Sequence, residues 1–183
     1  MIVLVGKTCS GKDTLKKILV EKYNFQPIVT VTSRPPRVGE VDGKDYFFVT
    51  KDQFLKLINM GIFAEYTSYK VANGDTWYYG SLQKDYGENS VIVLNPSGLH
   101  QIKKKGIPHK SFYIYANEDV ILNRAKLRGD NKKELLRRLE ADKKDFENFE
   151  EETDFFIVNN DEVALQTNAE LIWRYVNVEN QSK

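Results

Sequence analysis

Residues 1–20 read MIVLVGKTCSGKDTLKKILV, in which an apolar run, a glycine-bounded loop and a segment of helical periodicity follow one another. The continuous apolar run of residues 2–5 predicts a strand that is buried on both faces. Apolar residues then recur at the spacing of one helix face over residues 15–19. The loop between them ends in a Gly-Lys pair and fits the phosphate-binding P-loop pattern, except that Asp13 stands where the pattern has Ser or Thr. Because a strand precedes the loop and a helix follows it, we predict a site for nucleotide phosphates.

The residue types of this loop suit phosphate binding. Glycines let backbone N–H groups converge on phosphate oxygens, and the N-terminus of the following helix adds the positive end of its dipole. Lys12 would reach the β- and γ-phosphates as a point charge. An ordinary glycine-rich turn is the alternative interpretation, which the flanking elements make the weaker one. The residues that we expect at the nucleotide phosphates are Gly6, Lys7, Thr8, Cys9, Ser10, Gly11, Lys12, Asp13 and Thr14.

Length and composition indicate one globular domain. A chain of 183 residues, 41% hydrophobic and 29% charged, is long enough to bury roughly 70% of its unfolded surface. The net charge of +1 gives no global field for wrapping nucleic acid, and no apolar stretch approaches a membrane span. One cysteine excludes an internal disulfide and fits a reducing cytosol. With a strand predicted from residue 2, we also expect no signal peptide. These features favour a cytoplasmic enzyme without nucleic acid or membrane partners.

Strand and helix patterns alternate along most of the chain. This alternation predicts an α/β fold with a mainly parallel sheet flanked by helices, in a single domain. A β-rich segment at 28–80, with a turn at Asn73-Gly74-Asp75, interrupts it as an insertion. We expect further strands at 25–31, 47–49, 62–69, 76–79, 90–94, 111–115 and 155–158, and helices at 51–60, 98–105, 118–127, 132–149 and 162–175.

A second group of polar residues begins in the loop after residue 32. Arg34 and Arg37 flank two prolines, and Tyr46 and Tyr79 follow further along the chain. Guanidinium groups bind phosphate bidentately, and tyrosine hydroxyls add neutral donors. On composition alone, an Arg-Pro-Pro-Arg segment is more often a solvated loop or a proline-rich ligand than a phosphate site.

Five motifs occur together in the chain. They are the P-loop, SRPPRVGEVDGKDYFFV at 33–49, Glu65, YYG at 78–80 and IVNND at 157–161. In this combination the sequence resembles the guanylate kinase family over nearly its full length. The resemblance implies a P-loop kinase of one domain (1–183), with its core at 1–27, 81–127 and 139–183, a nucleotide-monophosphate-binding insertion at 28–80 and a short helical lid at 128–138. It also implies transfer of the γ-phosphoryl group of ATP to GMP or dGMP with Mg²⁺.

The resemblance assigns roles position by position. It implies that the acceptor GMP is held by Thr30, Arg34, Arg37, Tyr46, Glu65, Tyr79 and Ser81. A carboxylate that accepts from two purine N–H groups, with a hydroxyl that donates to the carbonyl, selects guanine and leaves unpaired groups against adenine. On the ATP side the resemblance implies Arg124 and Asn159, and it implies catalytic roles for Lys12, Arg34, Arg128 and Arg138. For Arg138 the alternative is a solvated ion pair with Glu134, four residues away.

Two positions depart from the family pattern. Asp13 replaces the hydroxyl that ligates Mg²⁺, and Val93 and Asn95 stand where the family has an Asp-x-Asp pair. An aspartate can still offer oxygen to a hard cation. We hypothesise that Asp13 substitutes for the missing strand-end carboxylate, and it is the one residue that we assign to the metal.

Three functional interpretations remain at this point. The first is a GMP or dGMP kinase, the second a broader deoxynucleoside monophosphate kinase, and the third a catalytically weak guanylate-kinase-like binding module. Retention of Gly11 and Lys12 favours an enzyme. The expected partners are small-molecule nucleotides, and the expected state is a monomer or a homodimer.

Overall fold

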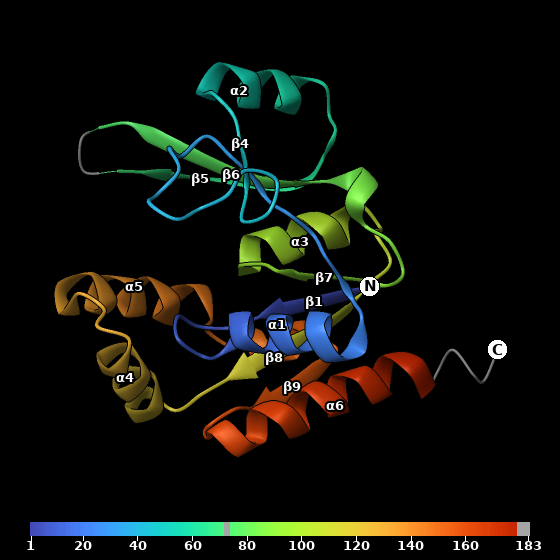
Figure 1. Cartoon of the computed structure of the whole chain (residues 1–183), viewed down its shortest axis with the longest axis vertical. Helices are drawn as coiled ribbons and strands as arrows, with labels where there is room; N and C mark the ends of the chain where they lie inside the picture. Colours follow the sequence, from blue (N-terminus) through green and yellow to red (C-terminus); the bar gives the residue numbers. More distant parts are fainter. Residues whose placement is uncertain (72–73, 179–183) are drawn as a thin grey trace.

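A computed structural model of the chain describes residues 1–71 and 74–178. In this part of the chain the core is a five-stranded sheet of order β2-β7-β1-β8-β9 with every neighbouring pair parallel (Figure 1). The expected parallel α/β sheet is therefore confirmed. The turn predicted at Asn73-Gly74-Asp75 lies partly outside the described residues. The core strands are β1 (Ile2–Val5), β2 (Gln26–Pro27), β7 (Ser90–Val93), β8 (Lys110–Tyr115) and β9 (Phe155–Val158).

Helices pack on both faces of this sheet. One face is covered by α1 and α6, which contact each other, and the other face by α3. At one end of the molecule, α4 and α5 lie beside each other near the start of α1 (Figure 1). None of the helices in the described ranges is long and apolar enough to cross a membrane. The bounds are α1 (Lys12–Tyr23), α3 (Pro96–Lys104), α4 (Glu118–Leu127), α5 (Lys132–Asp145) and α6 (Glu162–Val178).

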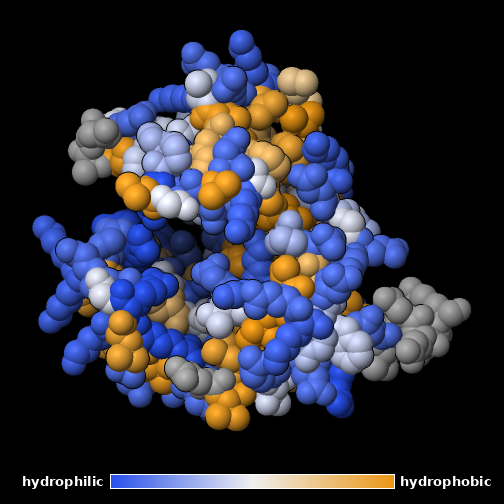
Figure 2. All heavy atoms as spheres, viewed as in Figure 1, coloured by the Kyte–Doolittle hydropathy of each residue, from blue (hydrophilic) through white to orange (hydrophobic). Residues whose placement is uncertain are grey.

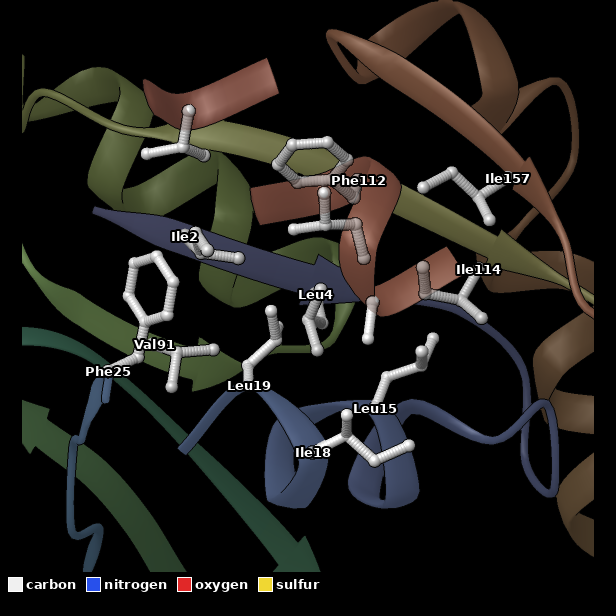
Figure 3. Close-up of a cluster of buried hydrophobic side chains, with 13 residues drawn as sticks. Ile2, Leu4, Leu15, Ile18, Leu19, Phe25, Val91, Phe112, Ile114 and Ile157 are labelled. Atoms are coloured by element: carbon white, nitrogen blue, oxygen red, sulfur yellow. The ribbon is translucent and has the colours of Figure 1, made fainter. Parts of the chain in front are cut away.

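The central strand β1 divides the core into two apolar clusters. Its four side chains are fully buried, as its unbroken apolar run predicts. Successive side chains of a strand point to opposite faces, so Ile2 and Leu4 join the cluster under α1 and α6, while Val3 and Val5 join the one under α3. Figure 3 shows Leu19 of α1 reaching toward Leu4 in the first cluster. Burial on both faces fixes β1, and with it the start of the P-loop.

The helix predicted at 132–149 is wrong at its C-terminal end. The helix α5 ends at Asp145, and Phe146 and Phe149 turn into the second cluster. The ring of Phe146 stacks on Tyr113 with centroids 5.5 Å apart, and Asn148 adopts a left-handed φ of 54°. Burial of the two aromatic rings outweighs continuation of the helix, which resumes only as the short 3₁₀ turn η2 (Phe149–Glu152).

The β-rich segment forms a second sheet of order β4-β3-β6-β5, covered by α2 (Figure 1). Phe54 of α2 is fully buried and stacks on Phe63 at 4.5 Å between ring centroids, which holds the helix against the sheet. The elements are β3 (Val31–Thr32), β4 (Phe47–Phe48), α2 (Lys51–Asn59), β5 (Phe63–Lys70) and β6 (Thr76–Leu82).

The single strand predicted at 25–31 is wrong, because its residues divide between the two sheets. The Ile28 N–H donates to the Val91 carbonyl at 3.0 Å, so the edge of the core sheet continues through residue 28. The insertion sheet begins at β3, and Thr30 therefore lies at the crossing between the two sheets. At the other end, β6 runs to Leu82 and is followed by the 3₁₀ turn η1 (Gln83–Asp85).

Candidate active site

The P-loop connects the carboxyl end of β1 to the start of α1. Two of its residues have a left-handed backbone, Cys9 with φ of 58° and Gly11 with φ of 95°. A Cβ at Gly6 would lie 2.3 Å from the Ile114 carbonyl oxygen, and one at Gly11 would lie 2.3 Å from the Asn159 side chain. Both glycines are thus required by close packing, and the loop lies tightly on the neighbouring strand ends.

Lys12 folds back over this loop. Its Nζ donates to the Lys7 carbonyl at 2.7 Å and lies 3.5 Å from the Ser10 hydroxyl. Burial lowers the pKa of Lys12, against the opposing pull of Asp13 and Asp142. Because the N-cap of α1 is Gly11, this residue provides no side-chain cap to the N–H groups of the first turn. The geometry leaves an ammonium and open backbone donors on one loop, which is what a triphosphate requires.

Asn159 is hydrogen-bonded to the backbone of the P-loop. It is fully buried, and its side-chain amide donates to the Ser10 carbonyl at 2.7 Å. The Asn168 amide donates to the Asn159 side-chain oxygen at 3.4 Å and to the Val158 carbonyl at 2.9 Å. The structure therefore gives Asn159 contacts that shape the loop, whereas its contact with the adenine side of ATP stays a prediction.

Arg124 reaches the same loop from α4. Its Nη1 lies 3.3 Å from the Ser10 carbonyl and 3.5 Å from the Cys9 carbonyl. Its Nη2 is buried and has no hydrogen-bond partner within the described ranges. A buried guanidinium donor without a partner is costly, and a ligand phosphate that reached this atom after a local movement would remove that cost. The ATP-side role of Arg124 stays a prediction.

The two arginines expected in a lid at 128–138 are paired with carboxylates of the same segment. Arg128 contacts both oxygens of Asp130, at 2.9 and 2.6 Å. Arg138 donates from Nε to Glu134 at 2.9 Å, which is the ion pair that the sequence offered as an alternative. Arg137, which the sequence analysis missed, binds the same carboxylate at two points, both 2.8 Å. The two arginines lower the pKa of Glu134 to about 2. A bound phosphate must therefore compete with these carboxylates for Arg128 and Arg138.

Asp142 on α5 occupies a P-loop donor. Its Oδ2 accepts a hydrogen bond from the Thr8 backbone N–H at 2.6 Å, across 134 residues of sequence. A carboxylate oxygen there has the charge and the geometry of a phosphate oxygen. The sequence analysis missed Asp142, because no local pattern distinguishes it from the other charged residues of α5.

Replacing Asp142 with alanine should lower the KM for the donor nucleotide triphosphate about three- to tenfold. The change frees the Thr8 N–H and removes a negative charge from the triphosphate site, and a charge-assisted hydrogen bond is worth about 1 kcal/mol or more. Steady-state kinetics with ATP measure the effect. Glu140→Ala is the matched control, since this exposed carboxylate lies on the same helix and pairs with Lys143 at 3.7 Å. A raised KM in Asp142→Ala would show instead that Asp142 assists binding.

The insertion places Arg34 in an aromatic and acidic environment. Only 3% of its surface is exposed, and its Nη2 contacts the two oxygens of Glu40 at 2.7 and 2.9 Å. Its guanidinium lies 5.3 Å from the centre of the Tyr46 ring, and Tyr46 meets Tyr79 edge to face at 6.1 Å. The Glu40 carboxylate raises the pKa of Arg34. Three residues predicted at the acceptor phosphate thus gather at one place, while Glu40 was missed.

Arg37 meets that group through its backbone, and Thr30 lies just before β3 of the insertion sheet. Arg37 is exposed, and its backbone N–H, rather than its guanidinium, donates to Glu40 at 2.7 Å. Thr30 is half-buried at the crossing between the sheets, where its carbonyl accepts from the Phe47 N–H at 3.0 Å. The roles of both side chains toward GMP stay predictions.

Glu65 and Ser81 form a buried pair between β5 and β6. Glu65 is 5% exposed and Ser81 fully buried, and the Ser81 hydroxyl donates to Glu65 Oε1 at 2.6 Å. Burial raises the pKa of Glu65, and the bonds from Ser81 oppose that rise. Gly98 of α3 adjoins the second oxygen, since a Cβ there would lie 3.2 Å from Oε2. A buried carboxylate of this kind is a hydrogen-bond acceptor for a polar ligand rather than a surface charge.

The insertion also touches the end of β7. The Asn95 side-chain amide donates to the Tyr69 hydroxyl at 3.1 Å, and its oxygen accepts from the Gly98 N–H at 2.8 Å, which caps α3. Tyr69 meets Tyr79 edge to face at 5.8 Å. Asn95 thus connects the core to the aromatic group around Arg34. Figure 2 shows a hollow between the insertion and the region of α4 and α5, with mainly hydrophilic residues around it.

Comparison with known proteins agrees with this geometry. A family model described as guanylate kinase matches residues 1–175. The guanylate kinase of Lactococcus lactis subsp. lactis is 34% identical over 171 residues, which are 90% of this chain and 82% of that protein. The guanylate kinase of Fusobacterium nucleatum subsp. nucleatum is 31% identical over 170 residues, 88% of each chain. A crystal structure of guanylate kinase from Anaplasma phagocytophilum matches with a TM-score of 0.66 at 26% identity, over 98% of this chain and 85% of that one.

Proposed function

The chain belongs to the guanylate kinase family, and from this premise we propose that it transfers the γ-phosphoryl group of ATP to GMP, giving ADP and GDP. The observation that carries the choice of acceptor is the buried Glu65 carboxylate paired with Ser81, because its oxygens can accept from two N–H groups of guanine. The same site accepts dGMP in this proposal, because the carboxylate reads the base and not the sugar.

Phosphoryl transfer leaves a protein little covalent work, so positioning and charge neutralisation dominate. Lys12, the open N–H groups of α1 and the free donor of Arg124 would hold the donor phosphates. Arg34 with Tyr46 and Tyr79 would present the acceptor phosphate, which is already a nucleophile at neutral pH. The lid residues assigned to the transferring group, Arg128 and Arg138, would exchange their own carboxylates for phosphate oxygens on closure, which also excludes water.

Asp13 is our candidate ligand for Mg²⁺. It is exposed in the first turn of α1, directly after Lys12, and a carboxylate there offers hard oxygen ligands. When bound, Mg²⁺ neutralises charge on the triphosphate. Asn95, at the strand end where the family has a carboxylate, uses both side-chain atoms within the protein.

Exchange of these two positions tests whether Asp13 compensates for Asn95. Asp13→Ser and Asn95→Asp should each lower kcat, and the double variant should recover part of the loss, because the carboxylate is then restored at the other position. Rates at saturating ATP and titrations with Mg²⁺ measure the coupling. Losses that simply add in the double variant would show that the two positions act independently.

A coupled assay of ADP formation tests the activity itself. With Mg²⁺ and ATP we expect turnover with GMP and dGMP, and none with AMP, dTMP or without acceptor. Broad turnover would identify a general deoxynucleoside monophosphate kinase, and GMP binding without turnover would identify a binding module. The binding module is not favoured, since Lys12 and the P-loop geometry are intact.

We place the enzyme in the cytoplasm, as its single cysteine and nucleotide substrates suggest. A monomeric or homodimeric state stays a prediction.

A further inference from the structure

A third hydroxyl continues the buried pair of Glu65 and Ser81. Tyr86 follows the turn η1, and its hydroxyl lies 2.6 Å from the Ser81 hydroxyl, which in turn lies 2.6 Å from Glu65 Oε1. The chain of three oxygens begins beside the 3₁₀ turn and ends at the carboxylate that reads the acceptor base. Neither the sequence motifs nor the roles discussed so far include Tyr86.

The direction of the hydrogen bonds follows from counting protons. An ionised carboxylate only accepts, and a serine hydroxyl has a single proton. Ser81 must therefore donate that proton to Glu65. The Ser81 oxygen then accepts, and Tyr86 is the donor in the second bond. Burial raises the pKa of Tyr86, so its phenol keeps its proton at neutral pH.

We propose that Tyr86 is a positioning residue for acceptor specificity: it directs the Ser81 proton onto Glu65 and so keeps this carboxylate a pure hydrogen-bond acceptor for the N–H groups of guanine. The inference rests on the proposed function and assigns it one more determinant. If the Tyr86 hydroxyl is removed, the Ser81 proton is free to turn elsewhere. A Glu65 that becomes protonated presents a donor to the N–H edge of the base, which it cannot satisfy.

Burial and the neighbouring groups shift the pKa of Glu65 in opposite directions. Burial raises the pKa of Glu65, whereas the Ser81 bonds and the positive charge of Lys105 lower it. Lys105 is the C-cap of α3, and its ammonium contacts the Phe63 carbonyl. Asp85 acts on Tyr86 rather than on Glu65. Loss of the hydroxyl chain therefore removes one of the influences that hold Glu65 ionised, and its pKa should rise.

The test is Tyr86→Phe in the full chain, with kcat and KM for GMP and for ATP measured from about pH 5.5 to 8.5. We expect KM for GMP to rise about three- to tenfold, which is the loss of one hydrogen bond, with kcat and KM for ATP unchanged within about twofold. The acid limb of kcat/KM for GMP should move to higher pH. Tyr66→Phe is the matched control, because this exposed tyrosine follows Glu65 on the same strand and points to the opposite face.

The result is separated from a general loss of structure in two ways. Ser81→Ala removes the middle hydroxyl and should move the same acid limb, and adding Tyr86→Phe to it should have no further effect. An unmoved acid limb, or equal losses toward GMP and ATP, would overturn the positioning role. Failure of the wild-type enzyme to phosphorylate GMP would instead overturn the proposed function, whatever the behaviour of Tyr86→Phe.

Discussion

Replacing Lys12 with methionine should lower kcat about a hundred- to a thousandfold, with little change in the KM for GMP. The Lys12 ammonium lies over the P-loop, where it would contact the β- and γ-phosphates, and loss of one such electrostatic contact costs about 3–4 kcal/mol in the transition state. Methionine keeps the length of the side chain but not the hydrogen bond to the Lys7 carbonyl. Single-turnover and steady-state rates with ATP and GMP measure the effect.

Stability distinguishes this loss from unfolding. The pKa of Lys12 is lowered by burial, which means that the folded protein disfavours the charge that the unfolded chain carries at neutral pH. Lys12→Met should therefore have an unchanged or higher melting temperature while it loses activity. Lys17→Met is the control, because Lys17 is exposed on the same helix and pairs with Glu21 at 3.8 Å. Near-normal kcat in Lys12→Met would contradict the role assigned to the P-loop.

Replacing Glu65 with glutamine should lower kcat/KM for GMP about thirty- to a thousandfold, mainly through KM. A glutamine amide offers one acceptor and turns its N–H groups toward the N–H groups of guanine, so buried donors are left unpaired at about 1–3 kcal/mol each. The preference for GMP over inosine monophosphate, which lacks the exocyclic amine, should shrink at the same time. Competition assays with the two nucleotides measure this, with the exposed Glu21→Gln as control.

The same variant makes a prediction about pH. Burial raises the pKa of Glu65 in the folded protein above its unfolded value. Such a group stabilises the fold when it is protonated, and this contribution is lost as the pH rises through the usual glutamate range and beyond. The wild type should therefore lose stability relative to Glu65→Gln between weakly acidic and neutral pH. Denaturant titrations of both proteins at the two pH values measure this, and an equal difference in their free energies of unfolding at both would show that Glu65 is not the group responsible.

Local patterns determined much of this protein. The unbroken apolar run of residues 2–5 is enough for a central strand, because only burial on both faces accommodates it. Gly11 and Lys12 are neighbours of that strand in sequence, so the P-loop needs no tertiary information to be found. The helix at Glu118–Leu127 and the strand at Phe155–Val158 likewise match their sequence patterns residue for residue. Periodicity failed where two rings, Phe146 and Phe149, outweighed the helix.

Only the tertiary structure determined which side chains are hydrogen-bonded to the groups of the site. Glu40 pairs with Arg34, Asp142 with the Thr8 amide, and Tyr86 with Ser81. In the sequence these residues look like any other charged or aromatic residues. A hydrogen bond between residues 134 positions apart depends on where two elements meet in space and not on the spacing of residues in the sequence. Apolar periodicity follows from the local backbone geometry, which involves only residues that are close in sequence. The pairing of polar groups is set by distance and burial, and these exist only once the core has brought the elements together.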